Sequence, residues 1–242
     1  LPNKLEVLYK VFKERQIGLF KNPVKFVDEQ GRERLSNFPK EPMIITPKDV
    51  NQDVVNEVMY NYGVGFNNSS LSFRKEYMLE YIDYLKKIKL VFDRFIGFLF
   101  LFRNQLIIWN KPLSIYRVLS SSASRKLASL DQFIEHNVYF SRIVYEDYIT
   151  TYKAIKGSGF EDILEKYINY QKIVIKLFSN SNDIKLTLKD VFNAVPLHNP
   201  RVPKWRIMLA YVASILPYSL KKEIIYKNLY KKQVELYLKY KG

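Results

Sequence analysis

The residues that could carry out chemistry are few and widely spaced. The chain of 242 residues has two histidines, His136 and His198, and no cysteine. Two isolated histidines without cysteine cannot form the usual Cys/His zinc sites, and a chain without cysteine has neither thiolate nucleophiles nor disulfides. His136 lies in an aromatic helical stretch, where a packed or surface histidine is commoner than a catalytic one, and His198 lies in a proline-rich loop. We therefore expect no metal site and no cofactor.

Glycines and paired carboxylates do not indicate a catalytic site either. Gly63-Val64-Gly65 lacks the third glycine of a dinucleotide-binding loop, and no Gly-Lys-Ser/Thr phosphate loop or Gly-x-Ser-x-Gly elbow occurs. The pair Asp28/Glu29 is followed closely by basic residues, and Glu161/Asp162 has the character of a helix first turn. The sequence favours a protein that is not an enzyme, with a dispersed active site as a third alternative.

The most informative pattern is a concentration of positive charge near the C-terminus. The chain carries 39 Lys/Arg and 24 Asp/Glu, a net charge of +15. Residues 201–242 hold ten Lys/Arg against two acids, Glu223 and Glu235, and so contribute +8 of this total. Such a segment favours an acidic partner, either an anionic membrane or an acidic protein surface, with nucleic acid also possible.

A helical wheel places most of these lysines on one side. At 100° per residue, five lysines of the expected helix 219–240 fall within an arc of roughly 140°, opposite an apolar arc. Two further groups add basic charge, Lys86/Lys87 with Lys89 and Arg125/Lys126. The predicted site for an acidic partner comprises Lys221, Lys227, Lys231, Lys232, Lys239, Lys86, Lys87, Arg125 and Lys126. A lysine face that is merely solvated is the equally weighted alternative.

The hydrophobic spacing predicts helices almost throughout. Expected helices are 5–20, 47–62, a long segment from 70 or 72 to about 109, two helices within 113–152, then 160–178, 187–195, 204–216 and 219–240. Phe95–Phe102 is apolar all round, which indicates a buried helix or, less favoured, a buried strand. Strand signals are scarce because no Asn-Gly or Asp-Gly hairpin turn occurs. We therefore expect an all-α fold, a multi-helix bundle or helical solenoid of about eight to ten helices.

The clearest connector is the proline-containing stretch 198–203. It divides an expected main helical domain, 1–198, from a basic C-terminal helical pair, 199–242, which we expect to pack on it as one structural unit. The longest uncharged apolar stretch, Phe95–Phe102, is far shorter than the roughly 20 residues of a membrane span. We therefore expect a soluble or peripheral intracellular protein, in the cytoplasm or alternatively the nucleus.

One segment resembles a known family. Residues 147–155 (DYITTYKAI) and 159–167 (GFEDILEKY) are similar to the late helix pair of AP180 N-terminal homology (ANTH) domains. In that pattern an Asp precedes a Tyr by five residues, a Gly opens the next helix, and Leu-Glu-Lys-aromatic follows. The family's basic phosphoinositide motif near the N-terminus is not visible here, so its lipid-binding residues are not transferred. The resemblance implies a helical solenoid that binds phosphoinositide membranes and clathrin-coat partners.

Two functions follow from these observations. The favoured one is a non-enzymatic adaptor or scaffold domain that presents a basic surface to a phosphoinositide membrane or coat. The alternative is a nuclear scaffold, of a replication or chromatin type, that binds an acidic protein or nucleic acid.

Overall fold

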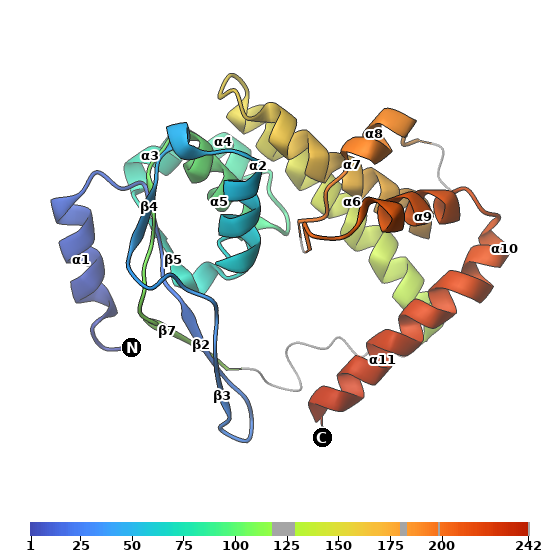
Figure 1. The fold of residues 1–242 in the computed structure, drawn as a ribbon, viewed down its shortest axis with the longest axis horizontal. Helices are drawn as coiled ribbons and strands as arrows, with labels where there is room; N and C mark the ends of the chain where they lie inside the picture. Colours follow the sequence, from blue (N-terminus) through green and yellow to red (C-terminus); the bar gives the residue numbers. More distant parts are fainter. Residues whose placement is uncertain (118–128, 180–182, 198, 242) are drawn as a thin grey trace. The chain divides into compact units, whose positions relative to one another are not determined.

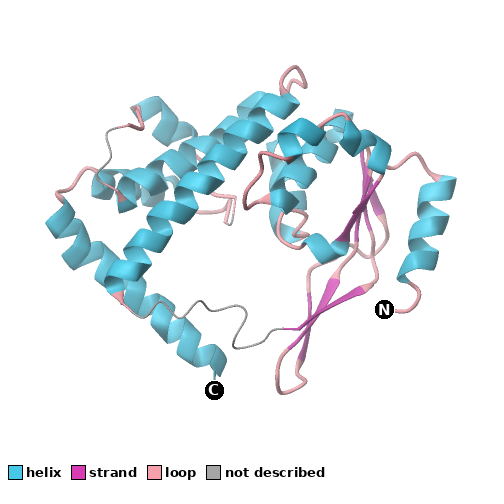
Figure 2. Cartoon of the chain, turned by 180° about the vertical axis from the view of Figure 1, so that it is seen from behind, coloured by secondary structure: helices cyan, strands magenta, loops and turns pink. Residues whose placement is uncertain are grey.

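The structure, a computed structural model, describes residues 1–117, 129–179, 183–197 and 199–241, with residues 236–241 described by their backbone alone. In this part of the chain, helices are accompanied by two β-sheets of four and three strands (Figures 1 and 2). The expected all-α fold is therefore wrong, and the protein is mixed α/β. None of the described helices is long and apolar enough to cross a lipid bilayer.

The chain divides into two compact units, each built from two stretches of sequence. The first unit comprises Leu1–Val118 and Asp147–Leu164, and the second comprises Leu119–Glu146 and Glu165–Gly242. Two long helices, α6 (Leu130–Ile155) and α7 (Glu161–Phe178), contribute residues to both units. This division differs from the boundary at 198/199 expected from the sequence, because the basic C-terminal helices share a unit with most of α7.

The first unit contains both sheets. The larger has the order β4-β6-β1-β5, in which β1 (Leu19–Lys21) runs parallel to β6 (Leu106–Ile108) and antiparallel to β5 (Leu71–Phe73), and β4 (Met43–Ile45) is antiparallel to β6. The smaller has the order β3-β2-β7, from β3 (Glu33–Leu35), β2 (Val24–Val27) and β7 (Ser114–Arg117). The β2–β3 connection is a tight turn in which Gly31 has φ 77° and the Asp28 carboxylate accepts from the backbone N–H groups of Gln30 and Arg32.

Short helices surround these strands. They are α1 (Lys4–Glu14), η1 (Pro47–Asp49), α2 (Gln52–Asn56), η2 (Glu57–Asn61), η3 (Asn68–Ser70), α3 (Lys75–Leu79), α4 (Ile82–Leu85) and α5 (Phe92–Arg103). The predicted long helix from 70 to 109 is thus two strands and three helices. Strands of three or four residues are too short to show alternation, so apolar runs such as Leu106–Ile108 read as part of a helix.

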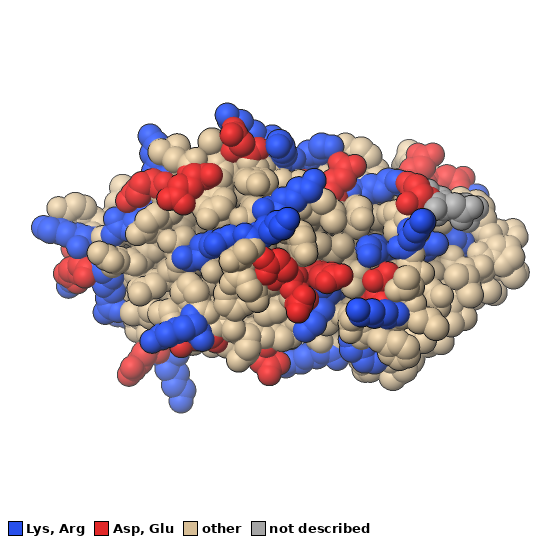
Figure 3. Space-filling view, turned by 90° about the horizontal axis from the view of Figure 1, so that it is seen from above, with Lys and Arg blue, Asp and Glu red and all other residues tan. Residues whose placement is uncertain are grey.

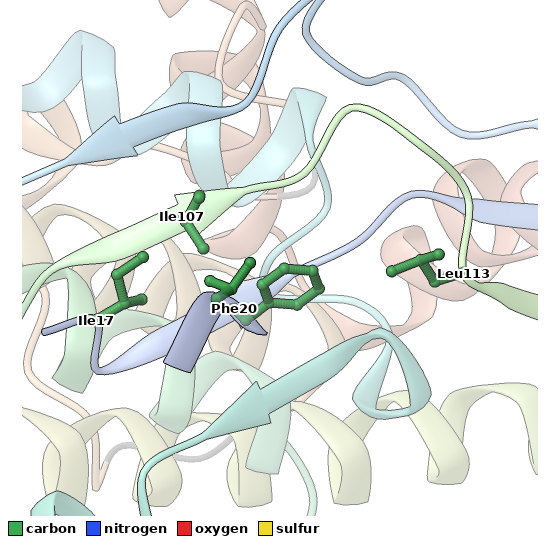
Figure 4. Close-up of a cluster of buried hydrophobic side chains, with 5 residues drawn as sticks. Ile17, Phe20, Ile107 and Leu113 are labelled. Atoms are coloured by element: carbon green, nitrogen blue, oxygen red, sulfur yellow. The ribbon is translucent and has the colours of Figure 1, made fainter. Parts of the chain in front are cut away.

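The core of the first unit lies around the parallel pair β1 and β6. Val11 of α1 packs with Ile17, Phe20, Ile107 and Leu113, as Figure 4 shows for the labelled side chains. The prediction that Phe95–Phe102 is a buried helix is confirmed, because every residue of this stretch is buried within α5. A helix that is apolar all round can only be stable when it is enclosed on all sides.

A buried carboxylate anchors the start of α5. Asp147 is fully buried and accepts hydrogen bonds from the backbone N–H groups of Lys89, Leu90 and Val91, at 2.9, 2.8 and 2.9 Å. The negative charge satisfies the N–H groups of the three residues that lead into α5, which lie before the helix and have no intrahelical acceptor, and it also lies near the positive end of the helix dipole. The segment that resembles ANTH domains forms the end of α6, a turn at Gly157-Ser158-Gly159 and the start of α7.

The second unit is helical in its described residues. Besides its parts of α6 and α7 it contains α8 (Leu188–Asn193), α9 (Lys204–Ser214), α10 (Tyr218–Leu220), η4 (Lys221–Tyr226) and α11 (Lys227–Lys241). The helices predicted at 160–178, 187–195, 204–216 and 219–240 are confirmed in position, within a few residues at their ends. Two apolar clusters hold the unit together, one of them around Phe133, Phe178 and Tyr226 and the other around Ile173, Val191 and Ile207.

Candidate binding surface

The C-terminal helix that carries the lysine pattern changes its helical type within its first turns. Residues Lys221–Tyr226 form a π-helix, in which the Lys227 N–H bonds the Lys222 carbonyl five residues back, before α11 continues as an α-helix. A π-helix has more residues per turn than an α-helix, so a wheel drawn at 100° per residue loses its phase here. As a result Lys221 and Tyr226 are both buried.

Lys221 is therefore not part of a docking surface, contrary to the sequence prediction. Its side chain is 1% exposed, and its ammonium group donates to the carbonyls of Lys176, Ser179 and Ser214 at 3.2, 3.4 and 3.3 Å. These carbonyls lie at or near the ends of α7 and α9, where helix C-termini lack intrahelical donors. Burial lowers the pKa of Lys221, and the neighbouring charge of Lys176 lowers it further. The residue has a structural role.

Two of the predicted lysines remain available on α11. Lys231 and Lys232 are exposed and form no ion pair with an acid in the described part of the chain. Lys227 is exposed but pairs with Glu223 one turn earlier, so its charge is partly neutralised within the helix. The side chain of Lys239 lies outside the described residues.

The other predicted residues lie in the first unit or outside the described residues. Lys86 and Lys87 are exposed in the first unit, where Lys86 pairs with Asp83 at 3.4 Å and the Lys87 ammonium lies 5.8 Å from the centre of the Tyr84 ring. They therefore belong to a different unit from Lys231 and Lys232. Arg125 and Lys126 lie outside the described residues.

Positive and negative side chains are mixed on part of the protein surface. On the face displayed in Figure 3, Lys and Arg side chains are interspersed with Asp and Glu side chains, and no broad area has a single sign. Surface ion pairs support this mixture, including Lys222 with Asp131 and Arg142 with Asp183, both at 2.7 Å. The hydrogen bond to Asp131 raises the pKa of Lys222. Positive charge is therefore not concentrated on the face that Figure 3 shows.

Sequence reasoning missed an apolar surface on α9. Trp205, Leu209 and Val212 are 58%, 57% and 48% exposed, although they are large apolar side chains. They follow an i, i+4, i+7 spacing, and this spacing could have revealed a common face once the helix was assigned. Leu188 and Phe192 of α8 are similarly exposed, and the Lys204 ammonium bonds the carbonyls of Phe192 and Ala194 at 2.9 and 2.8 Å.

The first unit contains a buried polar cluster that was also missed. Lys21 is 3% exposed at the end of β1, and its ammonium group donates to the hydroxyl of Ser70, which itself donates to the Asn67 carbonyl at 2.7 Å. Burial lowers the pKa of Lys21 to about 7, with Asp93 opposing and Lys4 reinforcing this shift. Asn22 lies beside the cluster with its amide nitrogen 3.2 Å from the Ser114 hydroxyl.

An amine that is partly neutral beside a serine hydroxyl is the arrangement of a nucleophile and its base. Here, however, Ser70 is fully buried and its hydrogen is committed to a backbone carbonyl, so a substrate does not reach it in this structure. The cluster accordingly links buried polar groups of β1, η3 and β7, although the amide oxygen of Asn22 has no hydrogen-bond partner in the part of the chain that the structure describes. Among the described residues there is no group of three or more His, Cys, Asp or Glu side chains that could hold a metal ion.

Comparisons with known proteins give no further guide, since no family model, curated protein or solved structure matches the chain. The resemblance of residues 147–167 to ANTH domains stays a prediction.

Proposed function

We propose that this protein is a non-enzymatic adaptor domain that docks on an anionic membrane, with phosphoinositides as the favoured lipids, through its second unit. The observation that carries the proposal is the pair Lys231/Lys232, exposed on a packed helix with no acid of the described chain bound to it. The helix is fixed in the unit by Tyr226, which stacks on Phe178 and donates its hydroxyl to the Leu177 carbonyl. The two lysines are therefore displayed from a folded element.

The electrostatics of the C-terminal region agree with such a partner. Ten basic residues face two acids between residues 201 and 242, and one of the two, Glu223, is paired with Lys227. Each Lys or Arg close to an anionic membrane contributes roughly 1 kcal/mol, so a few cations give weak, salt-sensitive binding. Bound phosphoinositide headgroups would add a local concentration of negative charge that a surface of neutral lipid lacks.

Co-sedimentation with lipid vesicles tests the proposal. Vesicles of phosphatidylcholine with phosphatidylinositol bisphosphate should bind the protein at low salt, vesicles of phosphatidylcholine alone should not, and added salt should reduce the bound fraction. The double variant Lys231→Gln/Lys232→Gln should weaken binding by roughly tenfold or more, since it removes about 2 kcal/mol of attraction. The matched control, Lys10→Gln/Lys48→Gln, removes two exposed lysines of the first unit and should bind normally.

Two results would overturn the proposal. One is a protein that stays in the supernatant with every vesicle at low salt. The other is a K231Q/K232Q variant that binds as tightly as the unchanged protein. A protein that ignores vesicles but shifts single-stranded DNA or RNA in a salt-dependent way would support the nuclear scaffold instead.

A further inference from the structure

Helix α9 has an apolar side that its own unit does not use. Its inner side is fixed by Ile207, which is 2% exposed in a cluster with Ile173 and Val191, and by Ser214, which is also buried. At 100° per residue, Trp205, Leu209 and Val212 fall within an arc of roughly 60° centred opposite these two residues. A surface helix normally exposes polar residues there, so this apolar stripe marks a contact with something outside the unit.

The stripe is bordered by cations. Lys204 and Arg206 lie about 100° to either side of Trp205 on the same wheel, and the Arg206 guanidinium is 5.2 Å from the centre of the Trp205 ring. Between residues 187 and 220 the chain has four basic residues, Lys189, Arg201, Lys204 and Arg206, against one acid, Asp190. That acid is 3.7 Å from Lys172. The border of the stripe is therefore cationic, with Arg206 lying against Trp205 and the Lys204 ammonium donating to the carbonyls of Phe192 and Ala194.

This combination fits the boundary between lipid headgroups and acyl chains. Interfacial helices place Trp and Leu side chains in that boundary and Lys or Arg side chains at the phosphates. We favour this lipid boundary over an acidic amphipathic helix of a protein partner. A single tryptophan between two cations matches a flat boundary between a polar and an apolar layer. Two further apolar residues, Phe192 of α8 and Ile215 at the end of α9, are also exposed, at 60% and 64%.

We propose that α9 inserts Trp205, Leu209 and Val212 into the headgroup–acyl boundary of an anionic membrane. This inference rests on the proposed membrane docking and deepens it, since it gives that docking an apolar component besides the charge of Lys231 and Lys232. Binding should then persist in part at salt concentrations that screen the lysines, because burial of apolar surface is not screened by salt.

Tryptophan fluorescence can test the insertion directly. The chain has two tryptophans, so Trp109→Phe leaves Trp205 as the sole reporter. Vesicles of phosphatidylcholine with phosphatidylinositol bisphosphate should shift the Trp205 emission to the blue, and brominated phosphatidylcholine in those vesicles should quench it. Leu209→Gln should reduce the vesicle-bound fraction by roughly tenfold while leaving the melting temperature nearly unchanged, since the side chain is exposed. Leu5→Gln, at a 79% exposed position of α1, is the matched control and should bind normally.

The possible failures are distinguishable. Co-sedimentation without a blue shift or bromine quenching would leave the membrane docking intact and overturn the insertion of α9. No co-sedimentation at all would overturn the docking itself. A Trp205 emission that is already blue and protected from iodide without vesicles would also overturn the insertion, because the stripe would then be covered by this chain or by a second copy of it.

Discussion

The ammonium group of Lys21 donates a hydrogen bond to the hydroxyl of Ser70 at a place where neither side chain reaches solvent. No carboxylate forms an ion pair with Lys21 in the described part of the chain, although Asp93 is close enough to act on it through space. A buried amine without a paired acid favours its neutral form. The first unit therefore carries a titratable group whose protonation opposes folding.

This gives a pH dependence of stability with a definite sign. Burial lowers the pKa of Lys21 to about 7 in the folded protein, from its ordinary value of 10.5. Between these values the unfolded chain binds the extra proton, so stability rises with pH from about 7 upward and is lowest at and below pH 7. The Lys21 contribution to the slope should approach about 1.4 kcal/mol per pH unit between pH 8 and 9.

Lys21→Met should remove that slope. The measurement is urea denaturation at several pH values from 7 to 9, followed by the fluorescence of Trp109 in a Trp205→Phe background. Lys10→Met, at an exposed position of α1, is the control and should keep the slope. If K21M and the unchanged protein showed the same pH dependence, the depressed pKa assigned to Lys21 would be wrong.

Asp147→Asn should destabilise the first unit strongly. The carboxylate serves three backbone N–H groups at the start of α5, and an amide keeps one acceptor oxygen while adding two donors that have no acceptor there. We expect a loss of about 3 kcal/mol, measured by chemical denaturation. Asp53→Asn changes an exposed acid in the first turn of α2 and should cost less than about 1 kcal/mol. Equal losses for the two variants would refute the role given to Asp147.

Alanine substitutions at Lys221 and Lys231 should affect different properties, the first the stability of the protein and the second its binding to vesicles. Lys221→Ala leaves buried carbonyls at the ends of α7 and α9 without a donor and opens a cavity, so we expect a loss of about 2–4 kcal/mol in unfolding free energy. Lys231→Ala should leave stability within about 0.5 kcal/mol and weaken vesicle binding. A Lys221→Ala variant of unchanged stability would contradict the buried position of this lysine.

Alanine substitutions at Gly18 and Gly31 should both lower the stability of the protein, for different physical reasons. A Cβ on Gly18 would lie 2.7 Å from both Asn104 Cβ and Phe100 Cδ1, so Gly18→Ala should cost about 1–3 kcal/mol through overpacking. Gly31 has open space around it but a φ of 77°, so Gly31→Ala should cost only about 1–2 kcal/mol of backbone strain. Thermal unfolding compares the two, and a harmless Gly18→Ala would show that Phe100 can move aside.

The elements that could be predicted from sequence are those whose stabilisation is local. The helices at Glu161–Phe178 and Lys204–Ser214 show periodic apolar residues over three or more turns, and Phe95–Phe102 is too apolar to be anything but enclosed. The strands could not be predicted, because Leu19–Lys21 becomes a strand only by pairing with partners 50 or more residues away. Such pairing leaves no periodic signal in three residues.

The candidate surface was predictable in part for a related reason. Lys231 and Lys232 lie beyond the π-helical segment, and the structure shows both exposed, as the wheel predicted. Lys221 lies at its start, where the change in residues per turn moves the side chain inward, and no composition rule signals that change. Trp205, Leu209 and Val212 resemble core residues by type, so only a folded structure reveals that about half of each side chain stays exposed.

Because each unit is built from two separate stretches of sequence, the chain cannot be divided into independent fragments at one point. A fragment that stops at residue 118 contains every strand of the first unit but lacks Asp147, and the N–H groups before α5 then have no acceptor. A fragment that begins at residue 119 carries Asp147–Leu164 away from the strands with which these residues form one unit. Neither unit can therefore be isolated by a single cut. If a deletion abolishes binding, misfolding of both units explains the loss, and the result does not locate a binding site.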